Sequence, residues 1–356
     1  MYTPKFYVNL SGSCINKIAN DGSYIVIGSE SGNLKIISRS GETITSKDLN
    51  EKIKDIALSP DNSYIVVATN KKVHCFYDLG GIRWDEKIRA DTKIMISPDN
   101  SYVNFGSAGD VYSISEYGKK TKEYIGKYWD LKSITSENQL SVVVNKRNKL
   151  EFLERSEPKQ KRFQSLKSIW GFEEENLIIH NVVMSSDGKK IIIFKENKKE
   201  SNDNDVVLVN KEKYQKKIIC FSDSGDILWE KECKSPTGIV EMAISQDSNY
   251  IVIRNWYNKI YFFTIDGNRL WKHELDKASI EKFYITPDGS YLAAWSMYNA
   301  YVFSKSGEII WKSDNLRSSN EFIESVSISN DGSLLAISSR NLNGTSTNST
   351  TSIYER

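Results

Sequence analysis

The sequence has few of the residues and motifs that support catalysis. Its 356 residues include three histidines and four cysteines, and none of them forms a His-x-x-x-His, His-Glu-x-x-His or Cys-x-x-Cys spacing. A Gly-x-Ser-x-Gly elbow, a Gly-x-Gly-x-x-Gly turn and a Walker loop are also missing. Zinc chemistry, an activated serine and nucleotide binding therefore have no support in the sequence. We expect a protein that is not an enzyme and that uses no cofactor and no metal ion.

Signals for export and for membrane insertion are lacking as well. No stretch approaches the ~18 apolar residues of a membrane span, and the amino terminus has no basic start followed by an apolar core. We expect a soluble, cytoplasmic protein. Its cysteines, Cys14, Cys75, Cys220 and Cys233, are then reduced strand residues, with a Cys220–Cys233 bridge as the alternative for an exported chain. The formal net charge of +2 gives no global field toward nucleic acid or membrane.

A short phrase recurs roughly every 40 residues along the chain. It reads Asn-Asp-Gly-Ser-Tyr at Asn20–Tyr24 and Ser-Pro-Asp-Asn-Ser-Tyr at Ser59–Tyr64 and Ser97–Tyr102. Related phrases contain Asp187, Asp247, Asp288 and Asp331. Self-similarity at this period is typical of one supersecondary unit that is repeated many times. Because repeat proteins usually present a surface rather than a fixed chemistry, the repeat favours a binding function.

Each unit contains four apolar runs of strand length in which apolar and polar residues alternate. In the second unit these runs are Ile53–Leu58, Tyr64–Thr69, Val73–Tyr77 and Ile82–Glu86. Asp-Gly and Asp-Asn pairs separate the first run from the second and favour tight turns, because Gly and Asn tolerate positive φ. Four short antiparallel strands repeated in this way predict an all-β fold, the β-propeller, in which each unit is one four-stranded blade.

The number of first strands predicts eight blades. These strands lie near Cys14, Ile53, Thr92, Leu131, Ile179, Ile239, Ile280 and Phe322. The last unit has no fourth strand of its own, whereas Phe6–Leu10 precedes the first unit as a spare strand. We expect this amino-terminal strand to pair in the last blade and to close the ring. Residues 1–356 then form a single propeller domain. Seven blades with an appended sheet is the alternative, because the fourth and fifth units are irregular.

Four of the predicted fourth strands carry a Gly-x-x-x-Trp motif. The motifs end at Trp84, Trp229, Trp271 and Trp311. Segments such as Ser-Gly-Asp-Ile-Leu-Trp-Glu-Lys-Glu resemble the tryptophan-docking repeat of quinoprotein-like (PQQ-type) propellers, and the Ser-Pro-Asp-Gly-Ser-Tyr phrase resembles WD40-like repeats. The resemblance implies an eight-bladed propeller in which these four tryptophans pack between neighbouring blades. Blades 1, 3 and 4 depart from the motif, and Thr45 stands where blade 1 would have its tryptophan.

The resemblance does not carry a cofactor with it. Quinoprotein dehydrogenases of that superfamily use an exported chain, often a vicinal cysteine pair, and carboxylates that bind calcium around the quinone. This sequence has no adjacent cysteines. The recurring aspartates leave open a metal ion or small ligand in the central channel. The simpler interpretation is that each carboxylate accepts hydrogen bonds from the backbone of its own Asp-Gly or Asp-Asn turn. In the fourth unit Glu137 replaces the aspartate.

Connections of unequal length predict a binding side. In a four-stranded blade, the turns between strands one and two and between strands three and four lie on one face of the disc. The other connections lie on the opposite face, and nearly all length variation falls there. It includes a polar insertion at about 196–216 in blade 5, for which we expect a polar loop and an extra hairpin, and the tract Asn341–Thr350. Loops on a rigid scaffold are where binding residues accumulate.

Large apolar side chains are predicted in the connections of this variable face. Tyr and Trp in exposed loops are the residue types that dominate protein interfaces, so these side chains are candidates for binding a partner. The alternative is that they fold back over the ends of the blades. The candidates are Trp170, Phe172, Trp256, Tyr257, Met297 and Tyr298.

Basic charge is concentrated in the middle of the chain. From Lys146 to Lys217 there are 17 Lys and Arg residues against 12 Asp and Glu residues. Lys198 and Lys199 are binding candidates in this region, which could meet an acidic protein, a phosphate backbone or anionic lipid. Three consecutive glutamates, residues 173–175, interrupt the basic charge. A solvated lysine-rich surface is the simpler interpretation.

The sequence therefore favours a non-enzymatic propeller scaffold that mediates protein–protein interaction as a subunit or adaptor of a larger assembly. The expected partner is another protein. Two alternatives stay open: a central-channel enzyme or binder of a metal or small ligand, and recruitment to nucleic acid or another polyanion through blades 4 and 5.

Overall fold

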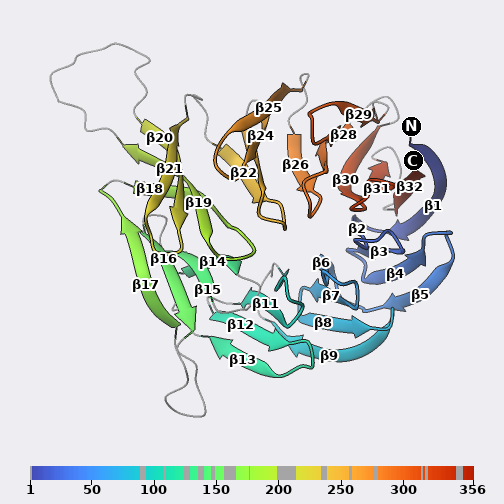
Figure 1. Cartoon of the computed structure of the whole chain (residues 1–356). Helices are drawn as coiled ribbons and strands as arrows, with labels where there is room; N and C mark the ends of the chain where they lie inside the picture. The colour runs from blue at the N-terminus through green and yellow to red at the C-terminus, as the bar shows by residue number, and fades with distance from the viewer. Residues whose placement is uncertain are drawn as a thin grey trace, which may run out of the picture.

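A computed structural model gives the structure of the chain. It describes residues 2–88, 94–107, 110–123, 129–134, 140–145, 149–155, 166–175, 177–198, 214–233, 239–255, 259–275, 280–313, 316, 320–341 and 348–356. Within these residues the chain forms 32 strands, which make eight antiparallel sheets of four strands each. The sheets stand side by side around a common centre (Figure 1).

The first four blades are runs of consecutive strands. Blade 1 consists of β2 (Cys14–Ile18), β3 (Tyr24–Ser29), β4 (Asn33–Ser38) and β5 (Thr43–Asp48). Blade 2 consists of β6 (Ile53–Leu58), β7 (Tyr64–Thr69), β8 (Lys72–Tyr77) and β9 (Gly81–Lys87). Blade 3 consists of β10 (Ile94–Ile96), β11 (Tyr102–Ser107), β12 (Asp110–Ser115) and β13 (Lys120–Glu123). Blade 4 consists of β14 (Trp129–Ile134), β15 (Leu140–Asn145), β16 (Lys149–Arg155) and β17 (Leu166–Glu173).

The next three blades follow the same order. Blade 5 consists of β18 (Leu177–Met184), β19 (Lys190–Lys198), β20 (Tyr214–Ser222) and β21 (Ile227–Glu232). Blade 6 consists of β22 (Ile239–Ile244), β23 (Tyr250–Asn255), β24 (Lys259–Thr264) and β25 (Arg269–Glu274). Blade 7 consists of β26 (Ile280–Ile285), β27 (Tyr291–Ser296), β28 (Ala300–Ser304) and β29 (Ile309–Lys312).

The last blade combines both ends of the chain. Blade 8 consists of β30 (Glu321–Ile328), β31 (Leu334–Asn341), β32 (Asn348–Glu355) and β1 (Thr3–Ser11). β1 pairs antiparallel with β32, from Thr3 opposite Glu355 to Ser11 opposite Asn348. In blade 1, β2 in turn contacts β30 and β31. The predicted all-β propeller and the pairing of the amino-terminal strand in the last blade are confirmed.

Second strands are buried on both sides because a neighbouring blade covers each face of the sheet. All six residues of β3 and all six of β7 are buried, whereas exposed and partly exposed residues alternate along the outermost strand β25. The core therefore lies between blades. One of its clusters joins Val26 and Ile36 of blade 1 to Ile56 and Val67 of blade 2. Burial of this kind fixes the angle between blades and makes the disc a rigid support.

First strands carry a feature that the sequence did not predict. In six blades the pairing of the first with the second strand shifts by one residue in the first strand. The shifts lie between Ile53 and Asp55, Leu131 and Ser133, Ile179 and Asn181, Ile239 and Glu241, Ile280 and Lys282, and Ile323 and Ser325. Such bulges turn the innermost strands at the edge of the central channel.

The insertion in blade 5 is only partly described. β19 and β20 stay paired as far as Lys198 opposite Tyr214, so the described part of the predicted insertion extends an existing hairpin. Residues 199–213, where the polar loop and the extra hairpin were expected, lie outside the described residues. The part of the chain that the structure describes holds no helix with the length and apolarity that a membrane crossing requires.

Candidate functional site

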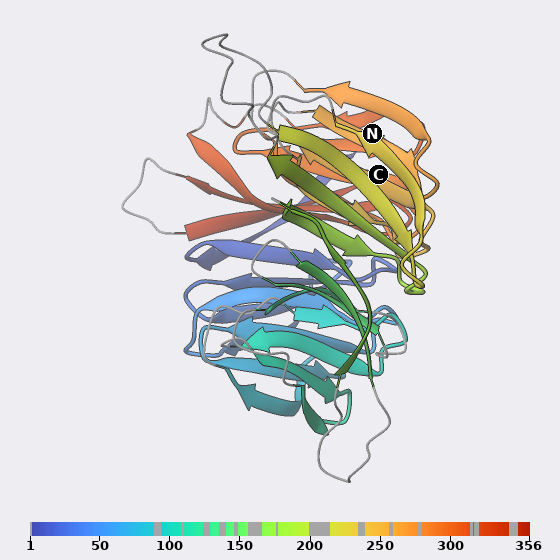
Figure 2. The same cartoon turned by 90° about the vertical axis from the view of Figure 1, so that its left-hand side faces the viewer.

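The two faces of the disc differ in how their connections are built. Strands within a blade are antiparallel, so first-to-second and third-to-fourth connections leave on one face, which we call the short-turn face. The other connections leave on the opposite face, which we call the long-loop face. In blade 7, residues 286–290 lie on the short-turn face and residues 297–299 lie on the long-loop face. Figure 2 shows the disc from its rim, with the two faces to the left and right.

The repeated phrase forms the turns of the short-turn face. In blade 7 the Thr286 hydroxyl accepts a hydrogen bond from the Tyr291 amide at 2.9 Å and donates one to Asp288 at 3.0 Å. Asp288 also accepts the amide of Ser290 at 2.9 Å, and Gly289 follows it with a φ of +68°. The recurring aspartates all accept the backbone amide two residues later, namely Asp21, Asp61, Asp99, Asp187, Asp247, Asp288 and Asp331.

These hydrogen bonds favour the charged form of the carboxylates. Partial burial by itself raises the pKa of Asp288, but the hydrogen bonds from Ser290 and Thr286 outweigh it, and the net pKa is lowered from 3.8. The pKa values of Asp61 and Asp331 are lowered by the same balance. The carboxylates are thus engaged within their own turns. Among the described residues, no group of three His, Cys, Asp or Glu side chains is placed to hold a metal ion; Glu137 lies outside the described residues.

Neighbouring turns on the short-turn face are joined to one another by hydrogen bonds. The backbone amide of Asn20 in blade 1 donates to the side-chain oxygen of Asn62 in blade 2 at 2.9 Å, and the Asn20 side chain donates to the Pro60 carbonyl at 2.8 Å. Asp247 of blade 6 donates its amide to the Pro287 carbonyl of blade 7 at 2.9 Å. This chain of turns holds the mouth of the central channel in one shape.

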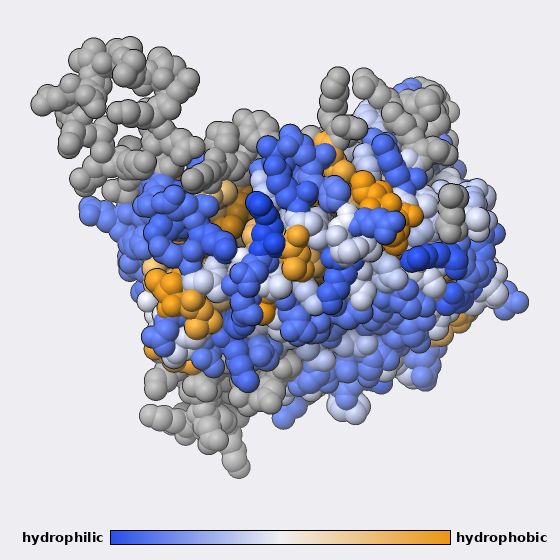
Figure 3. Space-filling model, turned by 45° about the horizontal axis from the view of Figure 1, so that its top comes forward, coloured by the Kyte–Doolittle hydropathy of each residue, from blue (hydrophilic) through white to orange (hydrophobic). Residues whose placement is uncertain are grey.

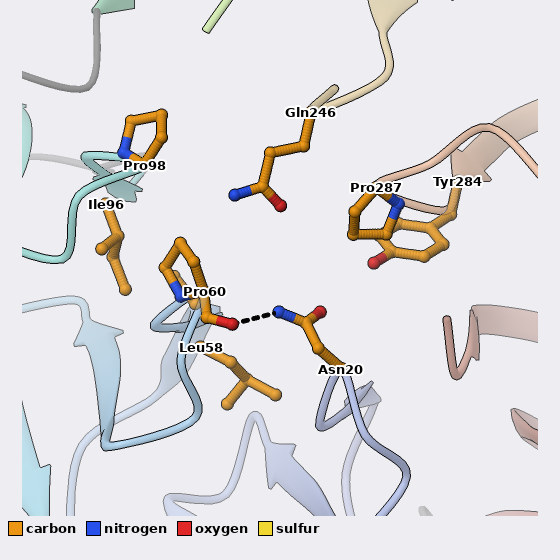
Figure 4. A pocket seen from close by; sticks show the side chains of 9 residues that line it. Asn20, Leu58, Pro60, Ile96, Pro98, Gln246, Tyr284 and Pro287 are labelled. Atoms are coloured by element: carbon orange, nitrogen blue, oxygen red, sulfur yellow. Dashed lines mark hydrogen bonds between the residues drawn. The ribbon is translucent and has the colours of Figure 1, made fainter. Parts of the chain in front are cut away.

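A cavity of about 250 Å³ lies inside this ring of turns (Figure 4). It opens on the short-turn face and takes its lining from turns and first strands of five blades. The lining residues are Asn20, Ala57, Leu58, Pro60, Ile96, Pro98, Gln246, Tyr284 and Pro287. Because blades 2 and 6 lie opposite each other in a ring of eight, a cavity that both of them line lies on the central axis.

The predicted docking tryptophans all lie in outermost strands and contact the next blade. The indole N–H groups of Trp84, Trp229 and Trp271 donate to carbonyl oxygens of the following blade, those of Glu116, Ile265 and Lys305, at 3.2, 3.1 and 3.0 Å. Trp311 packs against Tyr2 and Tyr354 of blade 8, with ring centroids 6.0 and 5.4 Å apart. In blade 1, where the motif is lost, the Thr45 hydroxyl instead donates to the Leu79 carbonyl of blade 2.

Trp170 corrects the sequence prediction. It does not lie in an exposed loop but in β17, the outermost strand of blade 4. Its indole N–H donates to the Asp223 carbonyl of blade 5 at 2.8 Å, and its ring lies 5.5 Å from that of Phe152 and 5.4 Å from that of Phe221. A Cβ at Gly225 would lie 2.9 Å from the Trp170 ring. These are the contacts of a docking tryptophan, so blade 4 has one although it lacks the Gly-x-x-x-Trp motif.

Phe172 lies in the same strand and faces the interior as well. Its ring centroid is 5.0 Å from that of Phe221, and the ammonium group of Lys195 is 5.3 Å from the Phe172 ring. Lys195 also pairs with Glu174. Both aromatic side chains of β17 are therefore packed between blades 4 and 5, and not over the ends of the blades.

Met297 lies in a turn of the long-loop face that backbone hydrogen bonds fix from three directions. The Ser296 and Asn299 backbones pair across the turn at 2.8 Å. The Met297 carbonyl accepts the Ile323 amide of blade 8 at 2.7 Å, and the Tyr298 carbonyl accepts the Leu316 amide at 3.1 Å. The Met297 side chain is nevertheless 42% exposed, and Tyr298 beside it is half-buried. The turn thus presents an apolar side chain to solvent on a fixed backbone.

The other candidates lie outside the described residues. Trp256 and Tyr257 belong to the connection between β23 and β24, and Lys199 follows β19. Lys198 is the last residue of β19, but its side chain is not described. Of the tract Asn341–Thr350, residues 342–347 are not described.

Several lysines in the basic middle region are paired with carboxylates of the chain. Lys190 lies 2.9 Å from Asp266 across two blades, and Lys217 lies 2.9 Å from Glu230. Lys216 lies 3.8 Å from Glu196. These ion pairs partly neutralise the local excess of positive charge.

Thiol and imidazole groups are embedded in the sheets. Burial raises the pKa of Cys14, Cys75 and Cys220 to about 12. None of the four cysteines forms a disulfide, so the Cys220–Cys233 bridge is not formed. Burial lowers the pKa of His74, and this effect outweighs the opposing influence of Glu51. His180 and His273 lie in other blades, next to Glu196 and to the Gly307 carbonyl.

Exposed apolar side chains are otherwise found mainly on outermost strands. They include Tyr7, Ile44, Ile82, Ile227, Leu228, Leu270 and Ile309. Figure 3 shows the apolar surface of one side as separate patches divided by polar surface. Because single exposed apolar residues are normal, this scatter on the rim does not mark a site by itself.

Comparison with known proteins places the chain among the propellers. Residues 212–355 match a family described as "Family of unknown function (DUF5711)". Among solved structures, the C-terminal WD40 domain of Sif2 superposes with a TM-score of 0.72 at 11% identity, over 100% of this chain and 98% of that one. The Dos1 propeller gives a TM-score of 0.65 at 12% identity, over 99% and 95%. BamB from Moraxella catarrhalis gives 0.58 at 12%, over 100% of both chains.

These likenesses concern the fold. The chain has the β-propeller fold that WD40 domains share with BamB, a propeller of PQQ-like repeats, and both resemblances noted in the sequence are confirmed at this level. Identities of this size carry no binding partner from one protein to another.

Proposed function

We propose that the protein is a non-enzymatic propeller scaffold that binds another protein through its long-loop face. The observation that carries this proposal is the Met297 turn. In this turn of the long-loop face, a large apolar side chain is exposed to solvent while hydrogen bonds hold the backbone in one conformation. A preorganised turn loses little conformational freedom on binding, so most of the contact energy is retained.

Methionine suits such a role. Its side chain is flexible and polarisable, so it adapts to the partner's surface, and Met is enriched at protein interfaces. Tyr298 adds an amphipathic ring beside it. Tyr is among the residue types over-represented at the energetic centres of interfaces. Together the two side chains offer a small apolar centre surrounded by polar loop residues, which is the usual anatomy of an interface.

The neighbouring blade extends this site in our proposal. Trp256 and Tyr257 connect the second and third strands of blade 6, just as Met297 and Tyr298 connect those of blade 7. Their side chains are not described, and their contribution stays a prediction. Trp170 and Phe172 are not part of the proposed surface because they pack between blades 4 and 5.

The test compares two exposed apolar residues of the same blade. Met297 is 42% exposed on the long-loop face, and Ile309 is 41% exposed on the rim. The full-length chain is used to isolate a partner, which is identified, purified and titrated against both variants. Met297→Glu should weaken the complex by at least about tenfold, whereas Ile309→Glu should leave the affinity within about twofold. Equal affinities of the two variants, or no partner at all, would reject the proposed face.

The two alternatives receive less support from the described residues. The recurring aspartates are hydrogen-bonded within their own turns. Their recurrence is explained by these turns and therefore does not support a metal site in the central channel. Four lysines of blade 5 are paired with carboxylates, namely Lys190, Lys195, Lys216 and Lys217, which weakens the case for a polyanion surface. A cytoplasmic location stays a prediction.

A further inference from the structure

The cavity at the short-turn mouth of the channel is independent of the proposed binding face, which lies on the other side of the disc. Five blades contribute to it, and hydrogen bonds join the turns of blades 1 and 2 and those of blades 6 and 7. Ligand sites in proteins are usually concave and largely preformed.

Six of the nine lining residues have apolar side chains, but the surface that the lining exposes to the cavity is somewhat more polar than apolar. Proline rings from three turns surround the cavity, those of Pro60, Pro98 and Pro287, and Leu58 and Ile96 come from first strands. None of the nine lining residues carries a formal charge. Lys17 is a nearby cation, and its ammonium group lies 5.4 Å from the centroid of the Tyr284 ring without belonging to the lining. Binding of a phosphate, a carboxylate or a metal ion would require charged or metal-ligating groups that this lining does not have.

Two polar side-chain groups project into the cavity. The amide of Gln246 points toward the centre of the cavity, and the hydroxyl of Tyr284 lies at its side (Figure 4). Neither makes a hydrogen bond to a residue that the structure describes, whereas the side-chain N–H of Asn20 is already bound to the Pro60 carbonyl. Burial raises the pKa of Tyr284 to about 12, so its hydroxyl stays protonated and can donate.

A primary amide matches the hydrogen-bonding pattern of a peptide group. It offers a carbonyl acceptor and an N–H donor side by side, and a peptide bond offers the complementary donor and acceptor. The volume of about 250 Å³ lies below that of pockets for drug-sized ligands, so it accommodates one or two side chains rather than a large molecule.

We propose that this cavity binds an uncharged segment of a second protein, with one aliphatic or proline side chain between the prolines and its peptide group bonded to Gln246 and Tyr284. The inference goes beyond the proposed function, because it gives the scaffold a second binding site on the opposite face. A protein with one site on each face can bridge two partners. Since the lining is uncharged, binding at this site is insensitive to salt.

The test uses blocked amino acids as probes and the full chain as the receptor. N-acetyl-leucine-N′-methylamide and N-acetyl-prolinamide are titrated and followed by ligand-observed NMR. We expect dissociation constants on the order of millimolar, the range of very small ligands. N-acetyl-aspartate amide and N-acetyl-lysine-N′-methylamide should bind at least about tenfold more weakly, because the lining cannot compensate a charge. Raising the salt concentration tenfold should change the leucine probe's affinity by less than about twofold.

Substitutions at Gln246 and Tyr284 test whether the probes bind in the cavity. Gln246→Ala and Gln246→Glu should each lower the affinity for the leucine probe by about tenfold, and Tyr284→Phe should lower it by about fivefold. Gln246 makes no hydrogen bond within the described structure, so these variants should unfold at the wild-type temperature. Gln215→Glu, the same change at an exposed position of β20, is the matched control and should bind normally.

Three outcomes would overturn the inference. One is the absence of binding by every neutral probe, and another is unchanged binding by Gln246→Ala and Tyr284→Phe. The third is stronger binding of glucose than of the blocked leucine, which would make the cavity a carbohydrate site. Met297→Glu should not affect the probes, so failure here and failure of the proposed binding face are distinguishable.

Discussion

The ammonium group of Lys5 lies 2.6 Å from a carboxylate oxygen of Glu355, although the two residues are 350 positions apart in the chain. The other oxygen of Glu355 lies 2.8 Å from the guanidinium group of Arg39 in blade 1. Near them the Tyr2 hydroxyl donates to the Gly332 carbonyl at 2.5 Å. The carboxyl-terminal strand therefore binds both the amino-terminal strand and the first blade, and this is the point where the ring of sheets begins and ends.

Deletion of residues 1–11 should strongly destabilise the protein. The truncation removes β1, with buried Tyr2 and Leu10, and leaves the edge of β32 unpaired. Loss of the two buried side chains alone is expected to cost roughly 5 kcal/mol, and an unpaired edge favours aggregation. Thermal unfolding and light scattering measure the two effects. Glu355→Gln is the control, and because exposed ion pairs contribute little it should cost at most about 1 kcal/mol. A truncated chain that melts with the wild type would contradict the role of β1.

Acid should destabilise the propeller through the carboxylates of its turns. The pKa of Asp331 is lowered from 3.8 in the folded state: burial raises it, but the hydrogen bonds from Ser329 and Ser333 have the larger combined effect. A lowered folded pKa means that the stabilisation is complete above 3.8 and is lost as the pH falls below that value toward the folded pKa. Lys5 and Arg39 lower the pKa of Glu355 from 4.5, so its ion pairs are lost in the same direction.

Urea unfolding between about pH 6 and about pH 3 measures this loss. Asp331→Asn keeps the shape and one acceptor oxygen but has no titrating carboxyl group. The variant should therefore lose less stability than the wild type over that interval. If the unfolding free energies of the two proteins depended on pH in the same way, the Asp331 carboxylate would not contribute to the acid sensitivity.

Gly289→Ala should destabilise blade 7 by on the order of 2 kcal/mol. Gly289 has a φ of +68°, which is unfavourable for alanine, and an added Cβ would lie 2.4 Å from a ring carbon of Tyr250 in blade 6. The control is Gly171→Ala, where φ is not positive and the nearest atom to an added Cβ is 3.4 Å away. Chemical denaturation should give a clearly lower unfolding free energy for Gly289→Ala than for Gly171→Ala. Equal unfolding free energies would mean that the Tyr250 contact is not a close one.

Trp170→Ala should behave as a stability variant and not as a binding variant. Loss of its contacts with Phe152, Phe221 and the Asp223 carbonyl is expected to cost about 3–5 kcal/mol. Trp271→Ala, which removes the equivalent contacts in blade 6, should cost a similar amount. Thermal unfolding measures both. If Trp170→Ala left unfolding unchanged and abolished partner binding, Trp170 would return to the candidates for the interface.

The fold was largely predictable because the repeat is local. Turn residues, strand alternation and the fourth-strand tryptophans all fall at regular spacing, and β6 and β7 begin and end at the predicted residues. The pairing of β1 was predictable because the last unit lacked one strand. Trp170 was misplaced because residue 166, four positions before it, is leucine rather than the glycine of the motif. Its role depends on Gly225 in the following blade, a contact that the sequence of β17 does not contain.

Sites were less predictable than strands, since they depend on which blades meet. The channel-mouth cavity joins Pro60 of blade 2 to Gln246 of blade 6, which no local pattern relates. The bulges of the first strands, as at Ile239 and Glu241, were missed for the same reason. The turn at Met297 is fixed by hydrogen bonds from the Ile323 amide to the Met297 carbonyl and from the Leu316 amide to the Tyr298 carbonyl, which only the folded chain brings together.

The most direct test of the proposed function is site-specific photo-crosslinking of the full chain with its partner. A photoreactive phenylalanine analogue is placed at position 297 on the long-loop face and, in a separate variant, at position 309 on the rim of the same blade. The proposal predicts a covalent adduct with the partner from position 297 and none from position 309. Adducts from position 309 with none from position 297 would contradict it.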